Sequence, residues 1–169
     1  MASGPEVPQP TGHGTDRAGA VASGPMARID EVKQLAGSEQ GLCVVSTTRP
    51  DGSVHASVVN AGPMTHPATG AEVFALVARG AANKVGLIRA AGRASLTFRR
   101  GWRWAGVEGP AEVIDGDNLP AGVELPGLLR DIFTAAGGTH DDWDEFDRVM
   151  ADERRLAILI DPVRVIGNG

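Results

Sequence analysis

The strongest chemical signal in the sequence is a run of positive charge between residues 79 and 103. Seven Lys or Arg residues fall in this interval and no Asp or Glu does, although the whole chain has a formal charge of −5. Near its start, Ala82 and Asn83 lead into Lys84, where a helix is expected to begin. The free N–H groups of a helix N-terminus favour phosphate. The segment therefore predicts a site for a compact anion at Arg79 and Lys84, with a solvated basic face as the alternative.

Two of the three Trp residues stand at the end of this basic segment. Trp102 and Trp104 alternate with Arg103 along an expected strand, so both indoles and Gly106 should share one strand face. A flat apolar face that ends at a glycine suits a planar ring, and ordinary barrel packing is the alternative explanation. Indoles also stack on nucleic-acid bases, but the net negative charge argues against a nucleic-acid partner.

The histidines form no catalytic pattern. His55, on an expected strand, is a weak candidate for a proton donor and has no acidic neighbour in the sequence. His66 precedes a proline and is expected at the surface of a loop. His140 opens an acidic run that is interpreted as a helix start capped by Thr139 or Asp141, rather than as a metal site. The glycine fingerprint of dinucleotide-binding folds, the phosphate-binding loop and the G-x-S-x-G pattern are all missing.

The composition is that of one globular domain. The chain has 169 residues, of which 42% are hydrophobic and 22% charged, enough for one substantial core. Cys43 is the single cysteine and is expected to be a buried small residue, which fits a reducing cytoplasm. We expect no membrane span and no secretory signal. Residues 1–25, rich in Gly, Pro, Ser and Ala, are predicted to be a disordered tail, and residues 26–169 to form the domain.

Hydrophobic periodicity divides this domain into short strands and helices. Strands are expected at 42–48, 54–61, 73–77, 94–98 and 102–114, with a last strand over 156–166 that bends at Pro162. Helices are expected around 29–36, 84–90, 128–133 and 143–150. On the strand that starts at Val54, residues 54, 56, 58 and 60 should face one way and 55, 57 and 59 the other. Short strands separated by turns favour an antiparallel barrel.

Three short motifs occur in order along the chain. They are Ala82-Asn83-Lys84, Gly92–Leu96 (GRASL) and Arg103–Gly109 (RWAGVEG). They resemble the S-R-K, N-P-R-A-S-L and R-Q-V-R-I-E-G segments of the split-barrel flavin and deazaflavin proteins, the family that includes pyridoxamine 5′-phosphate oxidase. The segment His140–Arg155 is similar to the branch that binds the 5-deazaflavin coenzyme F420. The resemblance covers roughly 27–167.

This resemblance implies a mainly β (α+β) fold: a six-stranded antiparallel split β-barrel of the FMN-binding type, with short flanking helices. It also implies a homodimer with one cofactor in each of two clefts between the subunits. Lys84 would hold the cofactor phosphate, and Arg79 would replace a contact that Ala82 lacks. The remaining cofactor-binding residues implied are Ser57, Val58, Val59 and Asn60 along the ring, Asn83 beside the phosphate, and Trp102, Arg103 and Trp104 as a wall of the cleft.

The activity implied by the resemblance is hydride transfer from reduced F420 to a conjugated C=C or C=N bond of a small hydrophobic substrate. Two alternatives stay open: an FMN-dependent oxidase or reductase on the same fold, and a non-catalytic protein that binds such a cofactor or haem. The pyridoxal-phosphate residues of the oxidase have no counterpart, so that activity is not expected. The expected location is the cytoplasm, with no metal site and with neither nucleic acid nor membrane as a partner.

Overall fold

A computed structural model describes residues 28–168, so the predicted N-terminal tail lies outside the described residues. The described part contains four helices and seven strands. In chain order these are α1 Ile29–Ser38, β1 Leu42–Thr48, β2 Val54–Thr65, β3 Glu72–Arg79, α2 Asn83–Ala91, β4 Arg93–Arg100, β5 Arg103–Ile114, α3 Leu125–Ala135, α4 Trp143–Asp152, β6 Arg155–Ile160 and β7 Arg164–Gly167.

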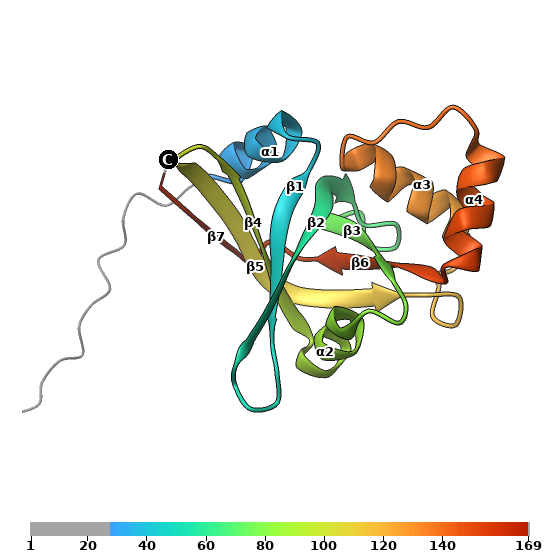
Figure 1. Cartoon of the computed structure of the whole chain (residues 1–169), viewed down its shortest axis with the longest axis horizontal. Coiled ribbons are helices and arrows are strands. Elements are labelled where there is room, and N and C mark those ends of the chain that lie inside the picture. The colour runs from blue at the N-terminus through green and yellow to red at the C-terminus, as the bar shows by residue number, and fades with distance from the viewer. Residues whose placement is uncertain (1–27, 169) are drawn as a thin grey trace, which may run out of the picture.

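Six of the strands form a closed antiparallel barrel, as predicted. The strands are hydrogen-bonded in the order β4, β1, β2, β3, β6, β5, and pairing between β5 and β4 closes the ring. The seventh strand, β7, is added to β5 outside this ring (Figure 1). Helices α3 and α4 lie together at one side of the barrel, and the C-terminus lies at the opposite side (Figure 1).

The predicted last strand is present as two strands, β6 and β7, which follow the same edge of β5. In β6, Ile160 is opposite Ala111, whereas in β7, Arg164 is opposite Glu108. Three residues of the last segment therefore oppose two of β5, as in a β-bulge. A Cβ atom at Gly109 would lie 1.8 Å from the carbonyl oxygen of Asp161, so the bulge needs a glycine on the facing strand.

Strand β2 is longer than the predicted 54–61, because it continues through Pro63 to Thr65. Strand β1 pairs with β2 only as far as Asn60, and β3 pairs with β2 from Ala61 onward. At Pro63, β2 therefore has a neighbouring strand on one side only, where a proline without an N–H group is tolerated. The predicted alternation is confirmed: Val54 and Val58 are exposed, while His55 and Val59 are partly buried.

The core has two layers that share β3 and β6. Inside the barrel, Phe74, Leu76 and Ile158 pack with residues of α1 and α2. On the outer side of the same strands, Ala75 and Leu159 pack against α3 and α4. Both faces of β3 and β6 are therefore buried, which explains why these strands have continuous apolar sequences instead of alternating ones.

Two glycines let α3 sit directly on the barrel. A Cβ atom at Gly62 of β2 would lie 1.9 Å from the carbonyl oxygen of Ala135. A Cβ atom at Gly41, which has φ of +71°, would lie 2.8 Å from the carbonyl oxygen of Ala136. The last turn of α3 thus packs on main chain, and its position relative to β2 is fixed.

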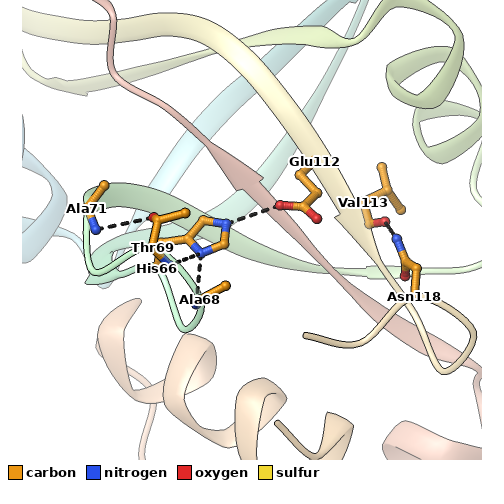
Figure 2. Close-up of polar contacts among 7 residues, drawn as sticks. All are labelled: His66, Ala68, Thr69, Ala71, Glu112, Val113 and Asn118. Carbon is orange, nitrogen blue, oxygen red and sulfur yellow. Dashed lines mark hydrogen bonds and ion pairs between the residues drawn. The ribbon is translucent and has the colours of Figure 1, made fainter. Parts of the chain in front are cut away.

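The connection between β2 and β3 is organised by His66, which is not the surface residue that was expected. Its side chain is only 12% exposed. Nδ1 accepts a hydrogen bond from the N–H of Ala68 at 3.1 Å, so Nε2 carries the proton that is donated to Glu112 at 3.1 Å (Figure 2). This histidine joins the β2–β3 turn to β5.

None of the helices within residues 28–168 combines the length and the apolar character that a membrane crossing requires.

Candidate functional site

A cavity of about 710 Å³ lies between the barrel and the α3–α4 pair. Its barrel side is formed by the middle of β2, the end of β3, the start of α2 and the start of β6. Its helix side is formed by the end of α3, the α3–α4 loop and one face of α4. A volume of this size accommodates a drug-sized or cofactor-sized molecule. We call it the main pocket.

Three cations gather on the barrel side of the main pocket. Arg79 and Arg155 are opposite each other in the β3–β6 ladder, and both line the pocket together with Lys84. One carboxylate, Glu153, holds the two arginines: its Oε1 lies 2.6 Å from Nη2 of Arg79, and its Oε2 lies 2.7 Å from Nε of Arg155. These two guanidinium groups hold the pKa of Glu153 below its usual range, with the bond from Arg155 as the largest cause. The cluster of three cations and one carboxylate has a net charge of +2.

Lys84 is the cation of this cluster that has no counter-charge within residues 28–168. Burial lowers its pKa, and repulsion from Arg155 lowers it further. Lys84 lies in the first turn of α2, where the N-cap residue Ala82 provides no side-chain acceptor and no acidic residue is present. The Val85 N–H donates to the carbonyl oxygen of Ala82 at 2.9 Å, so the ammonium group and the N–H groups of Asn83 and Lys84 are available to an anion.

Asn60 and Gln40 form a polar corner of the main pocket. The Asn60 side-chain N–H donates to the carbonyl oxygen of Gln40 at 2.8 Å. Gln40 has φ of +53°, a left-handed conformation that is unfavourable for a residue with a Cβ atom. The Asn60 bond therefore helps to hold a strained residue at the wall of the cavity, and the Oδ1 atom of Asn60 has no bond of its own within the described residues.

The helix side of the main pocket is apolar and aromatic. Ile132, Phe133, Phe146 and Met150 line it. The rings of Phe133 and Phe146 have centroids 5.0 Å apart, and Trp143 packs edge-on to both rings from behind. This wall offers apolar surface and ring edges, whereas the opposite wall offers positive charge.

Six of the predicted cofactor-binding residues line the main pocket, and they come from β2, the end of β3 and the start of α2: Val58, Val59, Asn60, Arg79, Ala82 and Lys84. Two predicted neighbours do not line it. Asn83 is exposed on the first turn of α2. Ser57 points into the barrel, where its Oγ is buried and has no hydrogen-bond partner among the described residues.

Trp102, Arg103 and Trp104, implied as a wall of a cleft between subunits, do not line the main pocket of a single chain, and their place in such a cleft stays a prediction. Trp102 belongs to the β4–β5 turn instead of the strand, and its side chain is 94% exposed. The main chain of Trp104 is held beside β7, because its backbone N–H donates to Oδ1 of Asn168 at 2.9 Å. The basic segment is thus divided between the pocket and this distant turn.

The weak candidate His55 also lies outside the main pocket. Its Nδ1 is 3.2 Å from the guanidinium of Arg49, which can only donate, so Nδ1 accepts and the ring proton is on Nε2. The acidic run after His140 is a helix start, as interpreted, but the cap is Asp142 instead of Thr139 or Asp141. The Asp142 carboxylate accepts from the N–H of Glu145 at 2.9 Å.

Gln40, Arg155 and the α3–α4 residues of the main pocket were not predicted as site residues. Arg155 stands at the start of the last buried strand, and a position opposite Arg79 could be assigned only after the β3–β6 pairing was known. For the apolar residues, the sequence showed helical spacing but not which protein surface the helices cover. Gln40 had one signal, its place just before Gly41 in a turn.

Solved structures with the same architecture were found at low sequence identity. A conserved hypothetical protein from Mycobacterium tuberculosis aligns with a TM-score of 0.61 and 19% identity over 83% of this chain and 84% of that chain. A protein titled F420 reductase aligns with a TM-score of 0.52 and 14% identity over 79% and 94%. A pyridoxamine 5′-phosphate oxidase-related, FMN-binding protein from Nostoc punctiforme aligns with a TM-score of 0.53 and 13% identity, over 81% of this chain and 80% of that chain.

The chain has the split-barrel fold. These identities establish the architecture alone. No family model and no curated protein matches the sequence. The fold class predicted from the three motifs is thereby confirmed, and the split barrel has neighbours whose titles name F420 and FMN.

Proposed function

We propose that this split-barrel protein is an oxidoreductase that binds the deazaflavin coenzyme F420 in the main pocket and reduces a conjugated bond of a small hydrophobic molecule. The observation on which the proposal mainly rests is Lys84. Among the described residues it is a partly buried cation without a counter-charge, at a start of α2 that has no side-chain cap, inside a cavity large enough for a cofactor. Such a charge lowers protein stability unless an anion binds there.

The residues of the chain fit an anionic cofactor with a flat ring. Lys84 and the first N–H groups of α2 would hold a tail phosphate, with Arg79 and Arg155 as neighbouring charges. Val58, Val59 and Asn60 of β2 would lie along the ring, and the Asn60 side chain would donate or accept at a ring edge. Bound F420 would supply the hydride, while the protein binds, orients and excludes water. His55 lies outside the pocket, so the proton is proposed to come from solvent.

We further propose that the active form is a homodimer. An apolar face of the β1–β2 ribbon is exposed: Val44 and Val58 are opposite each other, with 38% and 66% of their surfaces exposed, and Val54 is 62% exposed. Exposed apolar residues that are contiguous mark contact surfaces. A second copy on this face would cover the valines, and Trp102, Arg103 and Trp104 stay predicted as a wall of the cleft between the subunits.

A substitution on the apolar face tests whether F420 binding depends on the dimer. In Val44→Arg, a charge stands in the middle of the apolar face, and sedimentation velocity should show monomers. Val163→Arg is the matched control, because Val163 is 69% exposed on the connection between β6 and β7. F420 binding should weaken in the first variant only. If the wild-type protein is a monomer and still binds F420, or if Val44→Arg binds F420 as tightly as the wild type, the site does not depend on a dimer.

The decisive experiment is a titration of the purified protein with F420, FMN and haem in parallel, followed by addition of conjugated ketones and imines to the reduced complex. The proposal expects F420 to bind most tightly and its reduced form to be oxidised by at least one acceptor. Tighter binding of FMN would transfer the proposal to the FMN-dependent alternative on this fold. Binding of any cofactor without turnover would favour a storage or carrier role.

A further inference from the structure

We infer that the wall formed by Phe133, Phe146 and Met150 is the site that selects the acceptor substrate, and that it takes a flat, apolar ring system of limited width. This inference rests on the proposed function, because it assigns the cation cluster to the cofactor and the helix side of the main pocket to the substrate. Ile132 and the α3–α4 loop complete the wall.

The barrel side and the helix side of the main pocket suit different chemical groups. The barrel side carries three cations and one carboxylate. The helix side places the rings of Phe133 and Phe146 5.0 Å apart at an interplanar angle of 50°, and neither ring has a polar atom. An apolar, aromatic or conjugated molecule would bury surface against these rings. A charged or strongly hydrated substrate would lose hydration there without compensation.

The position of the Phe133 ring is set by the glycine at residue 138. A Cβ atom at Gly138 would lie 2.5 to 2.7 Å from three atoms at the far end of that ring. The ring therefore lies directly on the main chain of the α3–α4 loop. Phe146 and Trp143 pack against the same ring, with centroids 5.0 and 6.3 Å from its own. A side chain at residue 138 would have to displace the ring, and the main pocket, which the ring lines, is the space into which we infer that it moves.

This contact makes residue 138 a control of pocket width. The smallest change, Gly138→Ala, should narrow the helix side and leave Lys84, Arg79 and Arg155 untouched, since all three belong to barrel strands or α2. A matched control exists on the same helix pair. A Cβ atom at Gly127 in α3 would have no neighbour within 4 Å, so Gly127→Ala adds the same methyl group outside the pocket.

The test uses three probes on cofactor-free protein, each measured by isothermal titration: menadione as a two-ring conjugated acceptor, cyclohex-2-en-1-one as a one-ring acceptor, and inorganic phosphate for the cation cluster. Gly138→Ala should weaken menadione binding at least tenfold and change the other two by less than twofold. Gly127→Ala should behave as the wild type with all three. The double variant Phe133→Leu, Gly138→Ala should recover menadione binding relative to Gly138→Ala, because leucine is too short to meet the new methyl group and keeps the wall apolar.

The outcomes separate this inference from the proposed function. Equal menadione affinity in Gly138→Ala and the wild type, or no rescue in the double variant, would overturn the inference. Phosphate binding without any menadione binding would overturn it too, and would leave the anion site intact. The menadione pattern without phosphate binding would support the selective wall and contradict the proposed cofactor site. Circular dichroism of each variant shows whether a loss of binding comes from unfolding.

Discussion

Lys84→Met is the substitution that tests the proposed cofactor site most directly. It removes the ammonium group and keeps an unbranched side chain of similar length. A charge-assisted hydrogen bond is worth about 1.5 to 3 kcal/mol. Because Lys84 is only partly buried, solvent reduces the effective interaction, and we expect about 1.5 to 2 kcal/mol, the lower part of this range. At about 1.4 kcal/mol for each factor of ten, F420 should bind about 10- to 30-fold more weakly.

The chain offers an almost ideal control, because it has only one other lysine, Lys33. Lys33 lies on α1, forms an ion pair with Glu72 and is not part of the main pocket. Lys33→Met therefore removes the same charge from another place. F420 and inorganic phosphate should each be titrated into the wild type and both variants by fluorescence polarisation and calorimetry, respectively. Equal weakening in the two variants, or no weakening in Lys84→Met, would refute the assignment of Lys84 to the phosphate.

The lowered pKa of Lys84 gives the same variant a second, independent signature. In protein without ligand, the ammonium group destabilises the folded state through desolvation and through repulsion from Arg155. Lys84→Met should therefore unfold at a higher temperature than the wild type near neutral pH. As pH rises, the folded state loses the Lys84 proton at a lower pH than the unfolded state does. In the unfolded state the pKa of this lysine is near 10.5. The advantage of the variant should therefore shrink as pH rises toward 10.5 and vanish above it.

Three further predictions test neighbouring features. Glu153→Gln should raise the affinity for inorganic phosphate several-fold, because it removes the carboxylate that occupies both arginines; weaker binding would show instead that Glu153 is needed to orient them. Ser57→Ala should raise the melting temperature, since its buried Oγ has no partner among the described residues and an unsatisfied hydroxyl costs about 1 to 3 kcal/mol; a lower melting temperature would contradict this view of the hydroxyl. Burial raises the pKa of the Cys43 thiol to about 12, so dithionitrobenzoate at pH 8 should leave the folded protein unmodified and should titrate one thiol after denaturation.

Local patterns in the sequence predicted the helices and strands and the part of the candidate site around Lys84. The period of two along residues 54–60 gave the correct faces of β2, because strand alternation depends only on neighbouring residues. The lack of acidic residues around Lys84 correctly indicated a start of α2 without a negatively charged side chain, because this too depends only on neighbouring residues. The bend at Pro162 was also local, and the structure shows it as the bulge between β6 and β7.

The partners of these residues could not be predicted, because they depend on long-range pairing. Arg155 faces Arg79 only through the register of β3 with β6, which joins segments 76 residues apart (155 minus 79). Trp102 and Lys84 belong to one basic stretch of sequence, yet the β4–β5 turn and α2 place them apart. Charge density along a chain is therefore a weaker guide to a site than the topology that folds it.

The helical half of the main pocket belongs to one stretch of chain, whereas the barrel half comes from several strands and α2, and this has a consequence for how such a protein changes during evolution. Its helical half comes almost entirely from one uninterrupted insertion, 125–152, between β5 and β6. Two recombination events, one after Ile114 and one between Asp152 and Glu153, would replace that half and leave both Glu153 and every pairing of the ring in place. A lineage with this architecture could acquire new acceptors by exchanging a single segment, while the cation cluster that we assign to the cofactor would be inherited unchanged.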